Sequence, residues 1–206
     1  MNLLAQADHF YYNEYGGETM AYTEDELFDI LNGDGSRTGR TKARGLVHRD
    51  GDLHGASHVF VIRKVAGKLQ VLMQKRSADK DSFPSCWDTS AAGHLDVGED
   101  FDRAAVRELR EELGVSGPEP QYLFTQRVEY REIFYGKTFH DNEIDHVYIV
   151  EIDEPEDYFR PEPDEVECVQ WQDAERVLEA LRADDPAYCV RREEFEQLTD
   201  ILGRNI

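Results

Sequence analysis

The stretch from Gly93 to Val115, GHLDVGEDFDRAAVRELREELGV, constrains the fold more than any other part of this chain. Apolar residues recur there every four positions, which predicts an amphipathic helix with one stripe buried against a core. Asp100 or Asp102 would cap the start of this helix, and Gly114 would end it. The residues of the apolar stripe are Phe101, Ala105, Leu109 and Leu113.

The same helix concentrates acidic side chains on one face. Glu108, Glu111 and Glu112 lie within about one turn of one another, because successive helical residues rotate by about 100°. Like charges at this spacing destabilise a helix by about 0.2–0.5 kcal/mol per pair. One interpretation is a solvated acidic face that neighbouring arginines neutralise. The other is a site for a hard divalent cation, since Mg²⁺ binds a few carboxylates together with waters and substrate phosphates.

The order of residues around this helix resembles the Nudix box of the Nudix hydrolase family, G-x5-E-x7-R-E-U-x-E-E-x-G-U, in which U is apolar. Every specified position is filled. The resemblance implies an α/β protein of the Nudix fold, an α/β/α sandwich with a mixed β-sheet, that hydrolyses a diphosphate linked to another moiety. Gly93 and Gly98 are expected to form a turn before the helix. The matching residues are Gly93, Glu99, Arg107, Glu108, Leu109, Glu111, Glu112, Gly114 and Val115.

The resemblance also implies a metal site. Glu108, Glu111 and Glu112 would ligate Mg²⁺ or Mn²⁺, which are the expected cofactors. The carbonyl of Gly93 would add a ligand, and Glu99 would support the loop or make an outer metal contact. Such cations neutralise bridging phosphates and orient a water molecule for attack on phosphorus.

Three residues are expected to act in catalysis. Arg107 would orient the glutamates by ion pairing, and either Glu108 or Glu143 would be the general base. Glu108 cannot be both the innermost metal ligand and a free base in one step.

Three further stretches resemble isopentenyl-diphosphate isomerases, which share the Nudix fold: LHGASHVFVI, VLMQKRSADKDSFPSCWDTSAAGH and DNEIDHVYIV. In those isomerases a catalytic cysteine precedes the glycine and histidine that match Gly93 and His94, and this chain has Ala92 there. The isomerases also usually degrade the R-E-x-x-E-E core that is intact here. A hydrolase is therefore favoured over the two alternatives, an isomerase and a non-catalytic Nudix-fold nucleotide sensor.

The isomerase resemblance implies a second metal site. His48, His54, His94, Asp141 and Glu143 fall at or near the ligand positions of those enzymes, and imidazoles with carboxylates suit a transition metal or Mg²⁺. The alternative is that the histidines are loop or packing residues and that the two carboxylates only line the cleft.

Basic residues in the segment QKRSADK are expected to bind the substrate. Lys75, Arg76 and Lys80 match positions next to the diphosphate in the similar enzymes, and an arginine can bind phosphate oxygens bidentately. His94 is placed with them. A solvated hairpin end is the alternative.

The remaining pattern predicts strands and two C-terminal helices. Residues 58–64, 67–76 and 145–153 are rich in Val, Ile and aromatic residues and should pair as central strands. The apolar run 27–31, followed by a Gly/Asp-rich turn, predicts a hairpin. The tail predicts two helices broken near Pro186.

Composition limits the classes of partner. At 206 residues the chain fits one domain, expected over residues 25–206, after an arm at residues 1–24 that would dock on the domain or on a second subunit of a homodimer. A formal charge of −21 disfavours nucleic acid and anionic membranes, which leaves a small-molecule diphosphate as the expected partner. Three cysteines without a close pair, and no signal-like segment, predict a cytoplasmic protein with reduced thiols.

Overall fold

The structure is a computed structural model that describes residues 26–80, 82–134 and 136–203. The arm expected at residues 1–24, and with it the surface expected to form a homodimer, lies outside the described residues. No helix in the described part of the chain is long and apolar enough to span a membrane.

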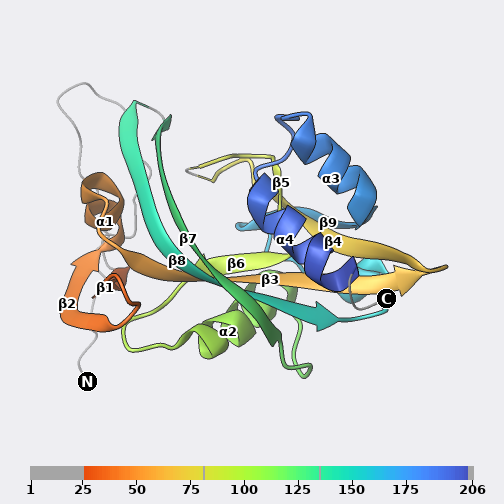
Figure 1. Ribbon diagram of the computed structural model, residues 1–206, viewed down its shortest axis with the longest axis horizontal. Coiled ribbons are helices and arrows are strands. Elements are labelled where there is room, and N and C mark those ends of the chain that lie inside the picture. Colours follow the sequence, from red (N-terminus) through yellow and green to blue (C-terminus); the bar gives the residue numbers. More distant parts are fainter. Residues whose placement is uncertain (1–25, 81, 135, 204–206) are drawn as a thin grey trace, which may run out of the picture.

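A mixed β-sheet forms the centre of the molecule (Figure 1). β3 (His54–Val65) pairs antiparallel with β4 (Lys68–Arg76) and parallel with β8 (Lys137–Glu151), so the three strands expected to be central are neighbours. Within the described residues the sheet has seven strands, in the order β5-β4-β3-β8-β7 with β6 on β3 and β9 on β4. The other strands are β5 (Trp87–Asp88), β6 (Ala91–His94), β7 (Gln121–Phe134) and β9 (Val166–Asp173).

Helices cover both faces of this sheet (Figure 1). α2 (Phe101–Leu113) packs its apolar stripe on one face. α3 (Ala174–Arg182) and α4 (Arg192–Gly203) pack on the opposite face, where Phe195 of α4 contacts Phe60 of β3 edge to face. The expected α/β/α sandwich with a mixed sheet, and the two expected C-terminal helices, are confirmed.

α2 begins and ends at residues that its sequence predicts. The Asp100 carboxylate accepts a hydrogen bond from the backbone N–H of Arg103 at 3.0 Å, a cap that stabilises a helix by about 1 kcal/mol. Gly114 ends the helix in the left-handed conformation, at φ 67°. A Cβ at Gly114 would lie 2.7 Å from the Cβ of Arg160, so this position requires glycine for its conformation and for its close contact.

Several elements lie in segments for which the sequence pattern makes no prediction. They are α1 (Arg44–Asp50), β7, β9 and the short 3₁₀ helix η1 (Glu156–Tyr158). β7 is an edge strand, and from Thr125 to Arg131 its side chains alternate between exposed and partly buried positions, as expected for a strand with one solvated face. The hairpin expected near the start of the described chain is confirmed as β1 (Leu27–Leu31) and β2 (Arg37–Ala43).

The sheet face beneath α4 changes from apolar to polar along its strands. Phe60 of β3 and Val147 of β8 lie in the apolar core beneath the helices. Because side chains alternate along a strand, His54 and His58 share the face of Phe60, and Glu143 shares the face of Val147. The sheet therefore has an apolar half covered by helices and a polar half that forms the floor of a cavity.

Candidate active site

A cavity of about 460 Å³ opens over the polar half of the sheet. The carboxylates of α2 enter it from one side, and residues of β3, β6 and β8 form its floor. The loop after β4 and the loop before α4 add basic and aromatic side chains. Of the residues that the sequence predicts for the site, the lining includes Arg76, Lys80, Gly93, His94, Arg107, Glu108, Glu111, Glu112, Asp141 and Glu143.

The three glutamates of α2 lie in different environments. Glu108 and Glu112 are buried, with 8% and 6% of their surfaces exposed. Glu112 Oε2 accepts hydrogen bonds from the backbone N–H of Ala92 at 3.0 Å and from Nε2 of Gln74 at 3.2 Å. Glu111 is more exposed and forms ion pairs with two arginines of the same helix. The fold thus fixes two of the three carboxylates and leaves the third at the open edge.

Burial raises the pKa of both fixed glutamates. The pKa of Glu112 rises to about 8, mainly through desolvation and further through repulsion from Glu108. Desolvation also raises the pKa of Glu108, although the ion pair with Arg107 opposes the shift. A divalent cation would favour the ionised form of both carboxylates. It would thereby offset the desolvation and the mutual repulsion that raise their pKa values, so the pair is suited to cation binding.

Arg107 lies at the centre of a network that holds the α2 carboxylates. Its guanidinium donates to Glu108 Oε1 at 2.5 Å and to Glu99 Oε2 at 2.9 Å. It also donates to the backbone carbonyl of His94 at 2.8 Å, which ties the helix to β6. Glu99 accepts a further hydrogen bond from the backbone N–H of Asp96 and is not among the cavity-lining residues. This arrangement suits an orienting role for Arg107 and a loop-supporting role for Glu99.

Gly93 lies in β6 and not in a turn, which corrects the expectation of a glycine turn at that residue. A Cβ at Gly93 would lie 2.0 Å from Oε1 of Glu108, so the carboxylate packs directly on the backbone of β6. Close approach is therefore the reason for glycine here. Gly98, by contrast, does have a turn conformation, at φ 79°.

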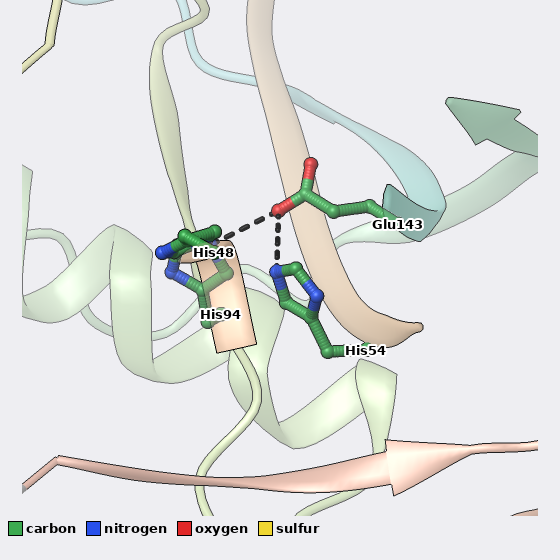
Figure 2. A group of neighbouring side chains, drawn as sticks. All are labelled: His48, His54, His94 and Glu143. Atoms are coloured by element: carbon green, nitrogen blue, oxygen red, sulfur yellow. Dashed lines mark ion pairs between the residues drawn. The ribbon is translucent and has the colours of Figure 1, made fainter. Parts of the chain in front are cut away.

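A second group of ligand-type side chains lies beside the α2 glutamates (Figure 2). His94 and Glu143 of this group line the cavity, whereas His48 and His54 lie next to them and do not line it. Ligand atoms of His48, His54, His94 and Glu143 all lie within 4.8 Å of one another. Glu143 Oε1 is 3.0 Å from His94 Nε2 and 3.3 Å from His54 Nε2. Asp141 Oδ1 is 3.7 Å from His54 Nε2 and 3.9 Å from His48 Nε2. We call His48, His54, His94, Asp141 and Glu143 the floor group. They come from α1, β3, β6 and β8, so the pairing of the strands brings most of them together.

The hydrogen bonding of the floor group fits a bound cation. Nδ1 of His54 lies 3.0 Å from the carbonyl oxygen of Asp52, and because a carbonyl only accepts, the proton is assigned to Nδ1. Nε2 of His54 then faces the Glu143 carboxylate with a lone pair, an arrangement that needs a proton or a cation between them. Three buried atoms at this point have no hydrogen-bond partner among the described residues: Nε2 of His48, Nε2 of His54 and Oδ1 of Asp141.

Desolvation keeps two of the floor imidazoles neutral. It lowers the pKa of His48 to about 2 and that of His94 to about 4. Desolvation raises the pKa of Asp141, whereas the close contacts with His54 and His94 outweigh desolvation and hold the pKa of Glu143 well below its usual range. Neutral imidazole is the form that binds metal ions.

Basic side chains from the end of β4 and from the loop after it border the cavity. Arg76 pairs with Asp88 at 3.0 Å, and both Arg76 and Lys80 line the cavity. Lys75 does not line it, and instead pairs with Glu167 at 3.1 Å. Adjacent residues of β4 point to opposite faces of the sheet, so Lys75 and Arg76 cannot occupy one site.

Two basic residues of the cavity belong to no motif in the sequence. Arg191, in the loop before α4, has its guanidinium carbon 4.7 Å from the ring centroid of Tyr130 and Nη2 3.7 Å from Asp141 Oδ2. Arg44, at the start of α1, also lines the cavity. Their signal in the sequence is only a positive charge in an acidic chain, because tertiary contacts bring them to the site.

Relatives of the chain carry two kinds of name. Nudix hydrolase 3 of Arabidopsis thaliana is 40% identical over 186 residues, which cover 86% of this chain and 23% of that protein. An isopentenyl-diphosphate Delta-isomerase of Ruegeria pomeroyi is 34% identical over 124 residues, covering 60% of this chain and 64% of the isomerase. The chain thus spans less than two thirds of the length of either relative.

Solved structures and a family model agree on the fold. The crystal structure of DR0079 from Deinococcus radiodurans matches with a TM-score of 0.65 and 21% identity, covering 84% of this chain and 98% of that chain. At 21% identity this similarity shows a shared fold alone. The family model described as NUDIX domain matches residues 53–192, which is more than half of the chain. The chain therefore belongs to the Nudix family.

Proposed function

We propose that the protein is a divalent-metal-dependent hydrolase that cleaves a nucleoside diphosphate or another X-linked diphosphate by attack of water on phosphorus. The observation that carries this proposal is that the α2 glutamates line one cavity together with His94, Asp141 and Glu143 of the floor group and with arginine and lysine side chains. Hydrolysis of a diphosphate needs such an arrangement, because the charge on the phosphates must be neutralised while water attacks.

The α2 glutamates would form the first cation site. Glu108, Glu111 and Glu112 would hold Mg²⁺ or Mn²⁺, and the carbonyl of Gly93 would be a further ligand. When bound, such a cation neutralises the bridging phosphates and favours ionisation of the attacking water. Arg107 holds Glu108 in position through its bond to Oε1.

The floor group would form the second cation site. His48, His54, His94, Asp141 and Glu143 offer imidazole nitrogens and carboxylate oxygens, a set that suits a transition metal better than Mg²⁺. His94 belongs to this group more than to the substrate-binding residues, because its Nε2 lies 3.0 Å from Glu143 Oε1.

Glu108 and Glu143 are the two candidates for the general base, and Glu108 could act only in a step in which it is not an innermost ligand of the cation. Burial raises the pKa of Glu108 in the metal-free protein, so its carboxylate takes up a proton more readily than an exposed glutamate does. Glu143 is the weaker base, since its contacts with His54 and His94 hold its pKa well below the usual range.

Arg76 and Lys80 would bind phosphate oxygens that face away from the cations. Both side chains line the cavity, and a guanidinium can bind a phosphate through two parallel hydrogen bonds. Lys75 is proposed to have no such contact, because its side chain does not line the cavity and its ammonium group pairs with Glu167 outside it.

Isomerisation of isopentenyl diphosphate is the second candidate function, because a relative named for that activity is 34% identical over 60% of this chain. The methyl side chain of Ala92 cannot transfer a proton. Incubation with isopentenyl diphosphate distinguishes the two functions, since formation of the dimethylallyl isomer would favour the isomerase and Ala92 predicts none.

A release screen tests the proposed hydrolysis. The full chain is incubated with a panel of nucleoside diphosphates, nucleotide sugars, dinucleotides and isoprenoid diphosphates, with Mg²⁺, with Mn²⁺ or with EDTA. We expect phosphate or monophosphate release with either metal, none with EDTA, and none with Glu112→Gln above background. Tight binding without turnover across the panel would identify a nucleotide sensor and contradict the proposal.

A further inference from the structure

A third group of titratable side chains lies between the floor group and the apolar core beneath α4. Nδ1 of His58 is 2.9 Å from Oε1 of Glu194, which projects from the first turn of α4. Nε2 of Gln126 donates to Glu194 Oε2 at 2.6 Å and to Asp145 Oδ2 at 3.1 Å. His58 and Glu194 line the cavity, yet neither has a role in the proposed hydrolysis.

Glu194 fixes the orientation of the His58 ring. The glutamate is 1% exposed and is itself held by Gln126, so it has little freedom to move. It engages Nδ1, and among the described residues no hydrogen-bond partner is found for Nε2 of His58, whose side chain is 15% exposed. A histidine held by a carboxylate at one ring nitrogen presents the other nitrogen in a defined direction.

The environment of His58 favours a positive charge on the ring. Desolvation alone would lower its pKa, but the carboxylates of Glu194 and Asp145 outweigh desolvation and raise the pKa to about 10. Both ring nitrogens then carry protons near neutral pH, and Nε2 is a hydrogen-bond donor.

The neighbours of His58 place this donor where phosphates are expected. His58 is the cross-strand partner of Ala92 in β6, whose backbone N–H binds Glu112. Along β3, His58 shares its face with His54 of the floor group. An imidazolium between two groups of cation ligands repels cations and attracts the anion that bridges them.

A cation in place of the imidazolium proton is disfavoured. Ligand atoms of His58, Asp145 and Glu194 lie within 4.8 Å of one another, as in a metal site. However, the ring of His58 and the amide of Gln126 occupy both oxygens of Glu194, and the same amide donates to Oδ2 of Asp145. Among the described residues only Oδ1 of Asp145 is left without a partner, so a single carboxylate oxygen is available to a metal.

We propose that His58 is a further active-site residue, which donates a hydrogen bond from Nε2 to a phosphate oxygen of the bound substrate while Glu194 holds its ring. The inference rests on the proposed function, because it requires a diphosphate in the cavity. His58 is then a substrate-contacting residue, and Glu194 is a positioning residue that acts through it.

Binding of methylenediphosphonate, a diphosphate analogue that is not hydrolysed, tests this role by calorimetry in the presence of Mn²⁺. We expect His58→Gln to weaken binding by about tenfold or more, since it loses a charged hydrogen bond, while Mn²⁺ uptake alone is unchanged. Glu194→Gln should weaken binding less, because the amide oxygen still accepts from the ring. His146→Gln is the matched control, since His146 lies on the opposite face of the sheet and stacks on Phe101, with 3.7 Å between the ring centroids. This variant should bind the analogue as wild type does.

A spectroscopic signal separates contact from a structural effect. The ¹⁵N resonance of His58 Nε2 should shift when the analogue binds to wild-type protein, and that of His146 should not. This measurement needs no variant, so it holds even where His58→Gln does not fold. An unmoved His58 resonance in the complex overturns the inference.

The outcomes also separate this inference from the proposed function. If wild-type protein binds no analogue, the diphosphate site fails and the role of His58 fails with it. If wild-type protein binds and hydrolyses its substrate while folded His58→Gln does so equally well, only the role of His58 is wrong. An Mn²⁺ ion lost specifically in His58→Gln would instead identify a cation site and overturn the hydrogen-bond role.

Discussion

The two cation-ligand groups of the cavity are built in opposite ways. The α2 glutamates lie between positions 108 and 112 of one helix, so helical spacing alone brings them together. The floor group draws on α1, β3, β6 and β8, from His48 to Glu143, and exists only when those elements pair correctly. A local pattern thus builds one half of the site, and the register of the sheet builds the other half.

The two groups also differ in charge. The α2 group offers carboxylates whose pKa burial raises, which is a set suited to a hard cation such as Mg²⁺. The floor group offers the imidazoles of His48 and His94, which burial keeps neutral, and such ligands suit a softer ion. The difference predicts that substitutions in the two groups have separable effects.

Glu112→Gln is expected to have the largest effect. The change keeps the shape of the side chain but removes its negative charge, so kcat should fall by about 10²-fold or more while the fold is retained. Steady-state hydrolysis measures this, with thermal denaturation to confirm folding. The control is Glu179→Gln, an exposed glutamate of α3 that should leave kcat unchanged. Wild-type rates in Glu112→Gln would remove the α2 group from the site.

Gly93→Ala should act almost as strongly without changing any charged residue. The added Cβ would meet Glu108 Oε1 at 2.0 Å and displace the carboxylate. A shift of about 1 Å in a catalytic group costs up to about 10²-fold, so we expect kcat to fall by about 10- to 100-fold. Gly45→Ala has no atom within 4 Å of its Cβ and is the matched control. Equal activity in both alanine variants would contradict the packing of Glu108 on β6.

His54→Ala tests the floor group by itself. Loss of one imidazole ligand should weaken Mn²⁺ binding to the floor group by about tenfold or more, with a smaller change in Mg²⁺ binding at α2. Calorimetric titration with each ion measures this. If both ions lose affinity equally, the two groups form one shared site and the distinction drawn here is wrong.

The thermal stability of the metal-free protein should depend on pH through Glu112 of the α2 group. Glu112 has a folded-state pKa of about 8 against an ordinary value of 4.5, so between these pH values folded protein holds a proton that unfolded protein has lost. The contribution of Glu112 to stability therefore falls as pH rises through this window. We expect the Tm of metal-free wild type to drop relative to that of Glu112→Gln as the pH rises from about 4.5 to about 8, to show no further relative drop above that, and to be restored by Mn²⁺. Parallel Tm curves for the two proteins would contradict the shift.

Lys75→Ala should have the smallest effect. Its ammonium pairs with Glu167 outside the cavity, and an exposed ion pair contributes little, so we expect KM within about twofold of wild type. Arg76→Ala, one residue further along β4, should raise KM clearly. A rise in KM with Lys75→Ala alone would reverse the assignment of these neighbours.

The same contrast between local and long-range structure explains what the sequence can predict. α2, its caps and its glutamates follow from periodicity and motif spacing within one helix, and each is found where the pattern places it. α1 escapes prediction because its seven residues are too few for a helical period to be recognised. β7 does carry the alternation of a strand, between Thr125 and Arg131. Resemblance to the isomerases anticipates the floor group, but residue spacing does not, since its members meet only through the sheet.

Single residues show the same limit. Lys75 and Arg76 are alike in charge and adjacent in sequence, and only the alternation of β4 separates them. Arg191 and His58 reach the cavity from a loop and from the middle of a strand, so no local pattern marks them as site residues.

Anomalous diffraction from crystals soaked with Mn²⁺ and methylenediphosphonate tests most directly whether both groups hold cations against a diphosphate. We expect one manganese peak beside Glu108 and Glu112 and another within the floor group, with the diphosphonate between them. Manganese found only outside the cavity, or none at saturating concentration, would show that these groups do not hold cations.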